Sequence, residues 1–64
     1  MSPLKRKRLR KKIESLRERI KEHKEKIETE RQKYFPNEGI INHWEKEIMG
    51  FEKQIEKAIS KLEE

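Results

Sequence analysis

Residues 9–34 read LRKKIESLRERIKEHKEKIETERQKY, and their apolar residues recur at alternating steps of four and three. This is the heptad spacing of a helix that packs against another helix along one narrow stripe. Most of the other positions are Lys, Arg or Glu, so the helix needs a partner along most of its length. The stripe comprises Leu9, Ile13, Leu16, Ile20, Ile27 and Tyr34.

Two polar residues, His23 and Glu30, occupy positions of the same stripe. A polar residue at a core position of a coiled coil commonly sets the register of packing, and we expect this role for both. For Glu30 we also expect an ion pair with a Lys across the interface.

A second heptad pattern runs from residue 41 to residue 62. It comprises Ile41, Trp44, Ile48, Phe51, Ile55, Ala58 and Leu62, and Ile59 widens it on one side. Pro36, between the two patterns, disfavours a helical conformation at Phe35, and the Asn-Glu-Gly sequence at 37–39 is typical of a turn. The sequence therefore predicts two helices joined by a short connection.

The predicted bounds are a helix over about 3–33 with Ser2 as N-cap, a turn over about 34–42 and a helix over about 43–63. Either Asn37 or Asn42 can cap the second helix. We prefer Asn42, because Asn42 and Glu45 have the spacing of a capping box and this choice leaves Gly39 outside the helix.

The predicted fold class is all-α, a single antiparallel two-helix hairpin of the coiled-coil type. Folding near Asn37 directs Ile13 toward Leu62, so the segment 5–12 is expected to project beyond the paired region. Two helices leave part of each stripe open to water, and we therefore expect homo-oligomerisation into a helical bundle.

The composition argues against several functional classes. The chain has no Cys and no Asp, and it contains only two His among its 64 residues. We therefore expect no enzyme activity, no catalytic residue, no cofactor and no metal site. No apolar run reaches the roughly 18 residues of a membrane span, and a cytoplasmic protein is the expectation.

The strongest functional signal is a basic segment at residues 5–12, which holds seven of the eighteen Lys and Arg residues and no acid. The rest of the chain holds eleven basic and thirteen acidic residues, so the net charge of +5 comes from this one segment. Its cations are Lys5, Arg6, Lys7, Arg8, Arg10, Lys11 and Lys12. Such density predicts contact with the backbone of RNA or DNA. An acidic protein, a membrane surface and a merely solubilising end are the alternatives.

The segment Gly39-Ile-Ile-Asn-His-Trp-Glu-Lys-Glu-Ile48, with Phe51 and Gln54-Ile55, resembles a pattern near the C-terminus of bacterial polymorphic toxins. In that family, the corresponding segment opens a terminal amphipathic helix. The resemblance covers about a quarter of the chain and implies a bacterial, toxin-associated helical module, and it transfers no catalytic residue.

In size and plan, the chain is also similar to plasmid copy-number regulators of the repressor-of-primer type. These are helical hairpins that dimerise into a four-helix bundle and bind RNA. The similarity lies in architecture, without a shared motif. The functional hypothesis is thus a non-catalytic interaction module that self-associates and presents a basic tip to nucleic acid or another polyanion. The alternative is a structural adaptor that binds a protein partner, or a toxin-associated module without a nucleic-acid role.

Overall fold

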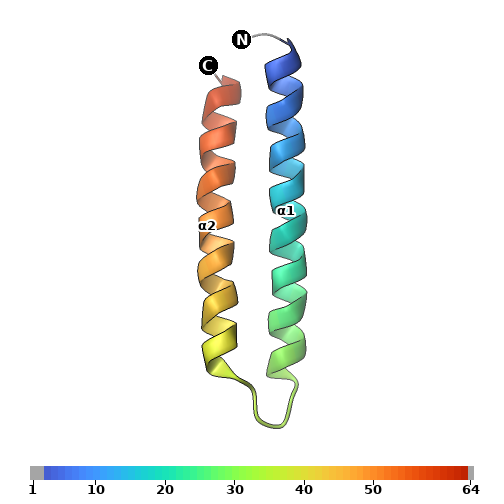
Figure 1. Cartoon of the computed structure of the whole chain (residues 1–64), viewed down its shortest axis with the longest axis vertical. Coiled ribbons are helices and arrows are strands. Elements are labelled where there is room, and N and C mark those ends of the chain that lie inside the picture. The colour runs from blue at the N-terminus through green and yellow to red at the C-terminus, as the bar shows by residue number, and fades with distance from the viewer. Residues whose placement is uncertain (1–2, 64) are drawn as a thin grey trace.

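The computed structural model describes residues 3–63, which form an antiparallel hairpin of two helices (Figure 1). Helix α1 spans Pro3–Arg31 and helix α2 spans Glu38–Glu63. The hairpin is a rod with principal extents of 51 × 14 × 11 Å. The all-α hairpin expected from the heptad pattern is confirmed, whereas the expected cap at Ser2 lies outside the described residues.

The core lies between the two helices and follows the heptad stripes. The most buried apolar side chains are Ile13, Leu16, Ile41, Ile48, Ile55 and Ala58. Leu9, Ile20, Phe51, Ile59 and Leu62 are partly buried and pack against the cluster of Ile13, Leu16, Ile55 and Ala58. Ile27 and Trp44 are also half-buried. One layer of side chains between two helices is a small core, so stability depends on each of these contacts.

Helix α2 begins five residues earlier than the sequence suggests, and the preference for Asn42 as its cap is wrong. The side-chain Oδ1 of Asn37 accepts a hydrogen bond from the Ile40 amide at 3.2 Å, which is the geometry of an N-cap. Beginning at Glu38 places an acid in the first turn and leaves Ile41 only 1% exposed. Burial of Ile41 and a satisfied cap together outweigh the helix-breaking tendency of Gly39.

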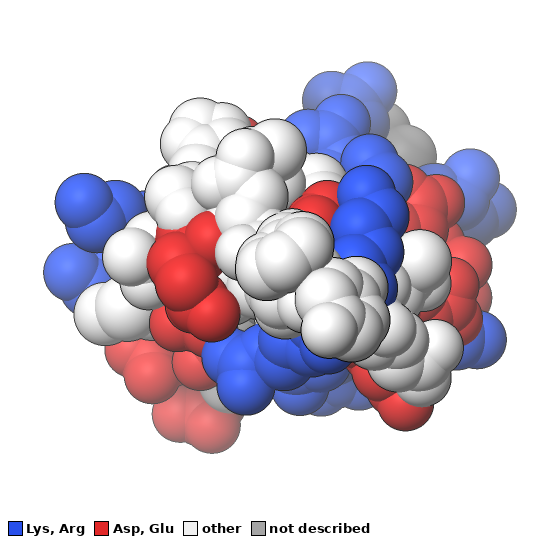
Figure 2. Space-filling model, turned by 90° about the horizontal axis from the view of Figure 1, so that it is seen from below, with Lys and Arg blue, Asp and Glu red and all other residues white. Residues whose placement is uncertain are grey.

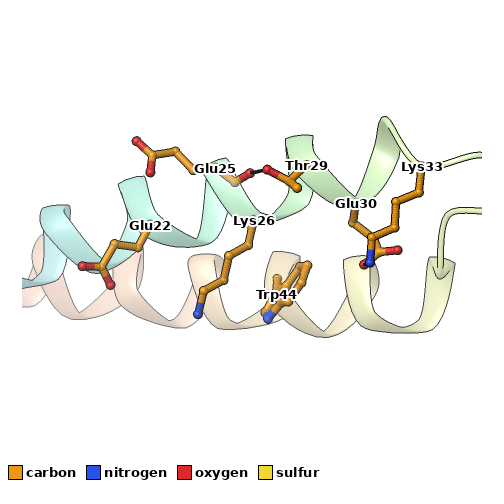
Figure 3. Close-up of a pocket in the computed structure, with 7 residues that line it drawn as sticks. All are labelled: Glu22, Glu25, Lys26, Thr29, Glu30, Lys33 and Trp44. Atoms are coloured by element: carbon orange, nitrogen blue, oxygen red, sulfur yellow. Dashed lines mark hydrogen bonds and ion pairs between the residues drawn. The ribbon is translucent and has the colours of Figure 1, made fainter.

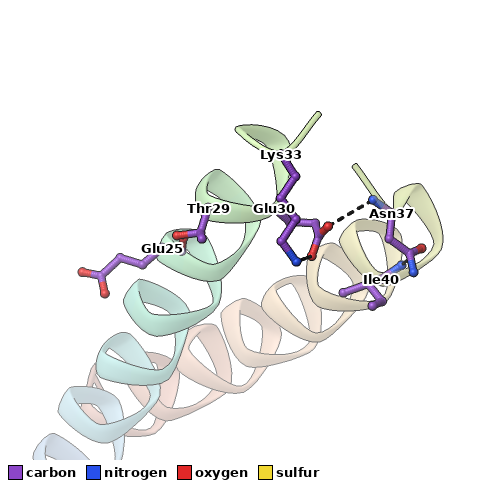
Figure 4. A network of polar contacts seen from close by, with 6 residues as sticks. All are labelled: Glu25, Thr29, Glu30, Lys33, Asn37 and Ile40. Carbon is purple, nitrogen blue, oxygen red and sulfur yellow. Dashed lines mark hydrogen bonds and ion pairs between the residues drawn. The ribbon is translucent and has the colours of Figure 1, made fainter. Parts of the chain in front are cut away.

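The Glu30 carboxylate holds the turn together, as Figure 4 shows. One of its oxygens accepts a hydrogen bond from Lys33 Nζ at 3.1 Å, and the other accepts one from the backbone amide of Asn37 at 3.2 Å. These two hydrogen bonds hold the pKa of Glu30 below its ordinary value, against the opposing effect of burial. The expected Lys partner across the interface is wrong, because the partner is Lys33, in the turn just after the same helix.

The turn occupies residues 32–37, with its midpoint between Tyr34 and Phe35 instead of near Asn37. Ile13 and Leu62 nevertheless line one hollow, as the predicted pairing requires. Tyr34 lies in the turn and not in a helix. The Tyr34 side chain is therefore 91% exposed and lies outside the helix–helix interface, contrary to the heptad prediction.

The basic segment does not project as a free overhang, contrary to the prediction. Both helices meet at the turn, and α1 has only three residues more than α2, 29 against 26. Figure 1 shows the end of α2 beside the blue N-terminal part of α1, with only the tip of α1 reaching past it. Leu9, within the basic segment, packs against the core cluster.

The cap assignment predicts that Asn37→Ala lowers the free energy of unfolding by about 1 kcal/mol, since the variant loses the hydrogen bond to the Ile40 amide. Urea unfolding followed by circular dichroism measures the change. The matched control is Asn42→Ala, at an exposed position inside α2, which should change stability by less than about 0.5 kcal/mol. A larger loss for Asn42→Ala than for Asn37→Ala would contradict the observed cap.

Candidate nucleic-acid interface

All seven cations of the basic segment are exposed and lie on α1. The structure divides them into two groups. Arg6, Lys7, Arg10 and Lys11 surround one surface hollow, together with Pro3 and Glu14. The other three cations, Lys5, Arg8 and Lys12, fall on a different side of the helix, as their spacing requires. Four cations therefore line one hollow together with a single acid.

The electrostatic setting of the segment favours an anion. No acidic residue lies in the first turn of α1, so the positive end of the helix dipole adds to the field of the cations. Mutual repulsion among cations three and four residues apart opposes the helix, and a bound polyanion relieves it. The arrangement can neutralise phosphates, which is an electrostatic function that requires no catalytic group.

The cations continue beyond the segment along both flanks of the α1 stripe, a feature that the sequence analysis missed. One flank carries the basic row, Arg10, Arg17, Lys24 and Arg31. The other flank carries Lys12, Arg19 and Lys26. Within each set the cations are seven residues apart, so the heptad pattern of the sequence was sufficient to predict both rows of cations.

The cations of the second flank are partly engaged. Arg19 lies over the ring of Phe51, with its Cζ atom 6.0 Å from the ring centroid. Lys26 extends across to α2 beside Trp44, as Figure 3 shows, and the two line a hollow near the turn. Acids line the same hollow, including Glu22 and Glu25. This mixture of signs makes it a weaker anion site than the hollow at Arg6 and Arg10.

A polar network in the middle of the rod joins the two helices. Glu47 on α2 contacts Nε2 of His23 with one carboxylate oxygen and Nε2 of His43 with the other, the latter at 2.6 Å. His23 also donates through Nδ1 to the carbonyl oxygen of Arg19 at 3.0 Å and packs edge-on against Phe51. His23 is thus a positioned polar residue of the interface, as its place in the heptad predicts.

The Glu47 carboxylate is the centre of this network. It contacts both imidazoles, and within residues 3–63 no group of three or more His or Glu side chains is arranged so that it could hold a metal ion. The hydrogen bond with His23 is the main cause that lowers the pKa of Glu47, and the nearby His43 adds to it, against the effect of burial. The network therefore acts as a cross-link between the helices.

The turn end of the rod carries a cluster of uncharged residues with charged residues among and around them, as Figure 2 shows from that end. Tyr34 and Phe35 are 91% and 83% exposed, and their rings pack edge-to-face with centroids 4.7 Å apart. This aromatic tip lies at the opposite end of the rod from the basic segment. No helix within residues 3–63 is long and apolar enough to cross a membrane.

The comparisons with known proteins yield no match to any family model, curated protein or solved structure. The resemblance of residues 39–55 to polymorphic toxins therefore stays a prediction. The fold and the charge pattern alone define the chain as an all-α helical hairpin with a cationic end.

The pKa of Glu47 predicts a specific acid sensitivity. Because its folded-state pKa lies below the ordinary value of 4.5, its contribution to stability is present above that pH and is lost as the pH falls through the folded-state pKa. Thermal midpoints measured between about pH 3 and pH 7 should therefore fall less steeply on acidification for Glu47→Gln than for the wild type. The exposed Glu28→Gln control should keep the wild-type profile. Superimposable profiles for Glu47→Gln and the wild type would refute the assigned cross-link.

Proposed function

We propose that this chain is a non-catalytic interaction module that self-associates and binds the phosphate backbone of nucleic acid through its basic segment. The observation that carries the proposal is the hollow of Arg6, Lys7, Arg10 and Lys11 on an ordered helix. Phosphate groups neutralised there release counterions, which provides affinity without base recognition. The proposal includes no catalytic step and no cofactor, and it places the protein in the cytoplasm.

The position of the aromatic residues supports backbone contact instead of base recognition. The basic segment itself contains no aromatic residue, whereas Tyr34 and Phe35 lie in the turn and Trp44 lies in the first half of α2. Stacking of bases on aromatic rings needs rings beside the phosphate-binding cations. We therefore propose binding that is insensitive to base sequence and strongly dependent on salt.

The large surface of the hairpin supports self-association. Its accessible surface is 5492 Å², whereas a compact monomer of 7.9 kDa exposes about 4,400 Å². Several large apolar side chains contribute to this excess, among them Met49 at 59% exposed and Ile40 at 38%. A rod with one layer of core gains most by covering such surface with further helices.

A structural adaptor for a protein partner is the second candidate function, and the aromatic tip favours it. Exposed aromatic residues are the side chains most often found as anchors at the centre of protein interfaces. In this alternative, Tyr34 and Phe35 enter a pocket of the partner and the basic segment acts only to keep the protein soluble. Two results together would favour the adaptor. The wild type would show no salt-dependent binding of RNA or DNA, and the Tyr34→Ser variant would no longer capture the protein partner.

Charge reversal tests the nucleic-acid proposal. The variant Arg6→Glu, Lys7→Glu, Arg10→Glu and Lys11→Glu should bind a short mixed-sequence RNA or DNA duplex at least about tenfold more weakly at low salt, since the main phosphate contacts are lost. Fluorescence anisotropy over a salt series measures the affinity.

The control for that experiment reverses four exposed cations elsewhere, Lys21, Lys46, Lys53 and Lys57, and so has the same net charge. Unchanged affinity for the control together with loss in the first variant supports a local site. Equal loss in both variants would show that only total charge matters, and equal retention in both would disprove the site.

A further inference from the structure

One side of the hairpin carries complementary charges in two rows. The basic row of α1, Arg10, Arg17, Lys24 and Arg31, repeats every seven residues and so keeps to one flank of the stripe. On the same side of α2 lies an acidic row, Glu45, Glu52, Glu56 and Glu63. The ion pair of Arg31 with Glu45, 2.9 Å between Nη2 and Oε1, shows that the two rows border the same side. We call this side the mixed-charge face.

Most charges of the mixed-charge face remain without a partner in the hairpin. Within residues 3–63, the ion pair of Arg31 with Glu45 is the one that joins the two rows. Arg17 and Lys24 on α1, and Glu52 and Glu56 on α2, form no ion pair with any described residue. The face therefore presents two parallel rows of opposite sign to whatever covers it.

The same face has an apolar floor near its open end. Ile13, Ile59 and Leu62 line a hollow of about 440 Å³ between the helices, and Arg10 and Arg17 form part of its rim. Met49 adds an exposed apolar side chain, seven residues before Glu56 and so on the same side of α2. An apolar floor bordered by charges is the composition of a helix-packing interface.

We propose that a second copy of this chain covers the mixed-charge face in a two-fold symmetric dimer with both turns at the same end. The face is complementary to itself only in this arrangement. A two-fold axis parallel to the rod places α1 of each copy over α2 of its partner at the same height, so each basic row meets an acidic row. With the turns at opposite ends, α1 lies over α1 and the basic rows repel each other.

The dimer makes a four-helix bundle and explains the position of the basic segment. With both turns at one end, the two basic segments lie together at the other end, which doubles the cations offered to one polyanion. This inference rests on the self-association in the proposed function and specifies its surface and orientation. Nucleic-acid binding through Arg6 and Lys7 does not depend on it and can be measured separately.

Paired charge-reversal variants test the proposal. One variant carries Arg17→Glu and Lys24→Glu, and the other carries Glu52→Lys and Glu56→Lys. When either variant pairs with itself in the proposed dimer, residues of like charge face each other across the interface. The dissociation constant of that dimer should therefore rise at least about tenfold above the wild-type value. In an equimolar mixture, one copy of each variant can pair, and residues of opposite charge then face each other at both α1–α2 contacts between the copies. The mixture should therefore regain the mass of a dimer in sedimentation equilibrium at low salt.

The mixture isolates contacts between chains, since charges within one chain are the same alone and mixed. Three results would each overturn the proposal. They are a mixture that does not regain the mass of a dimer, either variant alone with the mass of the wild type, and a wild type that is monomeric. Circular dichroism reports whether each variant stays helical. Both variants keep the basic segment, so RNA binding that persists while dimerisation fails would reject this inference and leave the phosphate site standing.

A spin label tests the orientation on the otherwise unmodified chain, even if a charge variant does not fold. A nitroxide on Tyr34→Cys, at the exposed tip, lies near its counterpart when both turns share one end. Turns at opposite ends place the labels about the full rod length of 51 Å apart. Double electron–electron resonance should give a separation below about half that length, and a distance near 51 Å would overturn the parallel arrangement.

Discussion

The hydrogen bonds of the Glu30 carboxylate are the constraint on which the rest of the hairpin depends. Glu30 occupies a position of the heptad stripe that would otherwise hold an apolar residue, and its carboxylate is nearly buried. A buried carboxylate is costly unless its oxygens accept hydrogen bonds, and here Lys33 and the Asn37 amide supply them. Because Asn37 is also the cap of α2, one side chain ties the last turn of α1 to the first turn of α2.

Where the turn closes decides what the charged residues can do. The pairing of the helices moves as the turn moves, so closure at residues 32–37 places the end of α2 beside the basic segment. The four cations around one hollow are therefore held on a packed helix instead of a free extension. The same register brings Glu47 to His23 and Glu45 to Arg31, which are the polar contacts between the helices.

The heptad periodicity was sufficient to predict two helices, their antiparallel packing and most of the core, because apolar spacing is a local property of the sequence. It could not locate the turn, since Asn37 and Asn42 both carry a plausible cap signal. Burial of Ile41 and the Glu30 contacts distinguish the two, and both are tertiary interactions. The exposure of the seven cations could be predicted, but their place beside α2 could not, because it depends on the register.

The most direct test of this account is an NMR titration of the backbone amide of Asn37. The amide donates to the Glu30 carboxylate, so its proton shift should report the protonation of that group, with a midpoint below the ordinary carboxylate value of 4.5. The Glu30→Gln variant should abolish the titration. An Asn37 amide that does not titrate in the wild type, or one with a midpoint at or above 4.5, would contradict the claim that Glu30 sets the turn and the register.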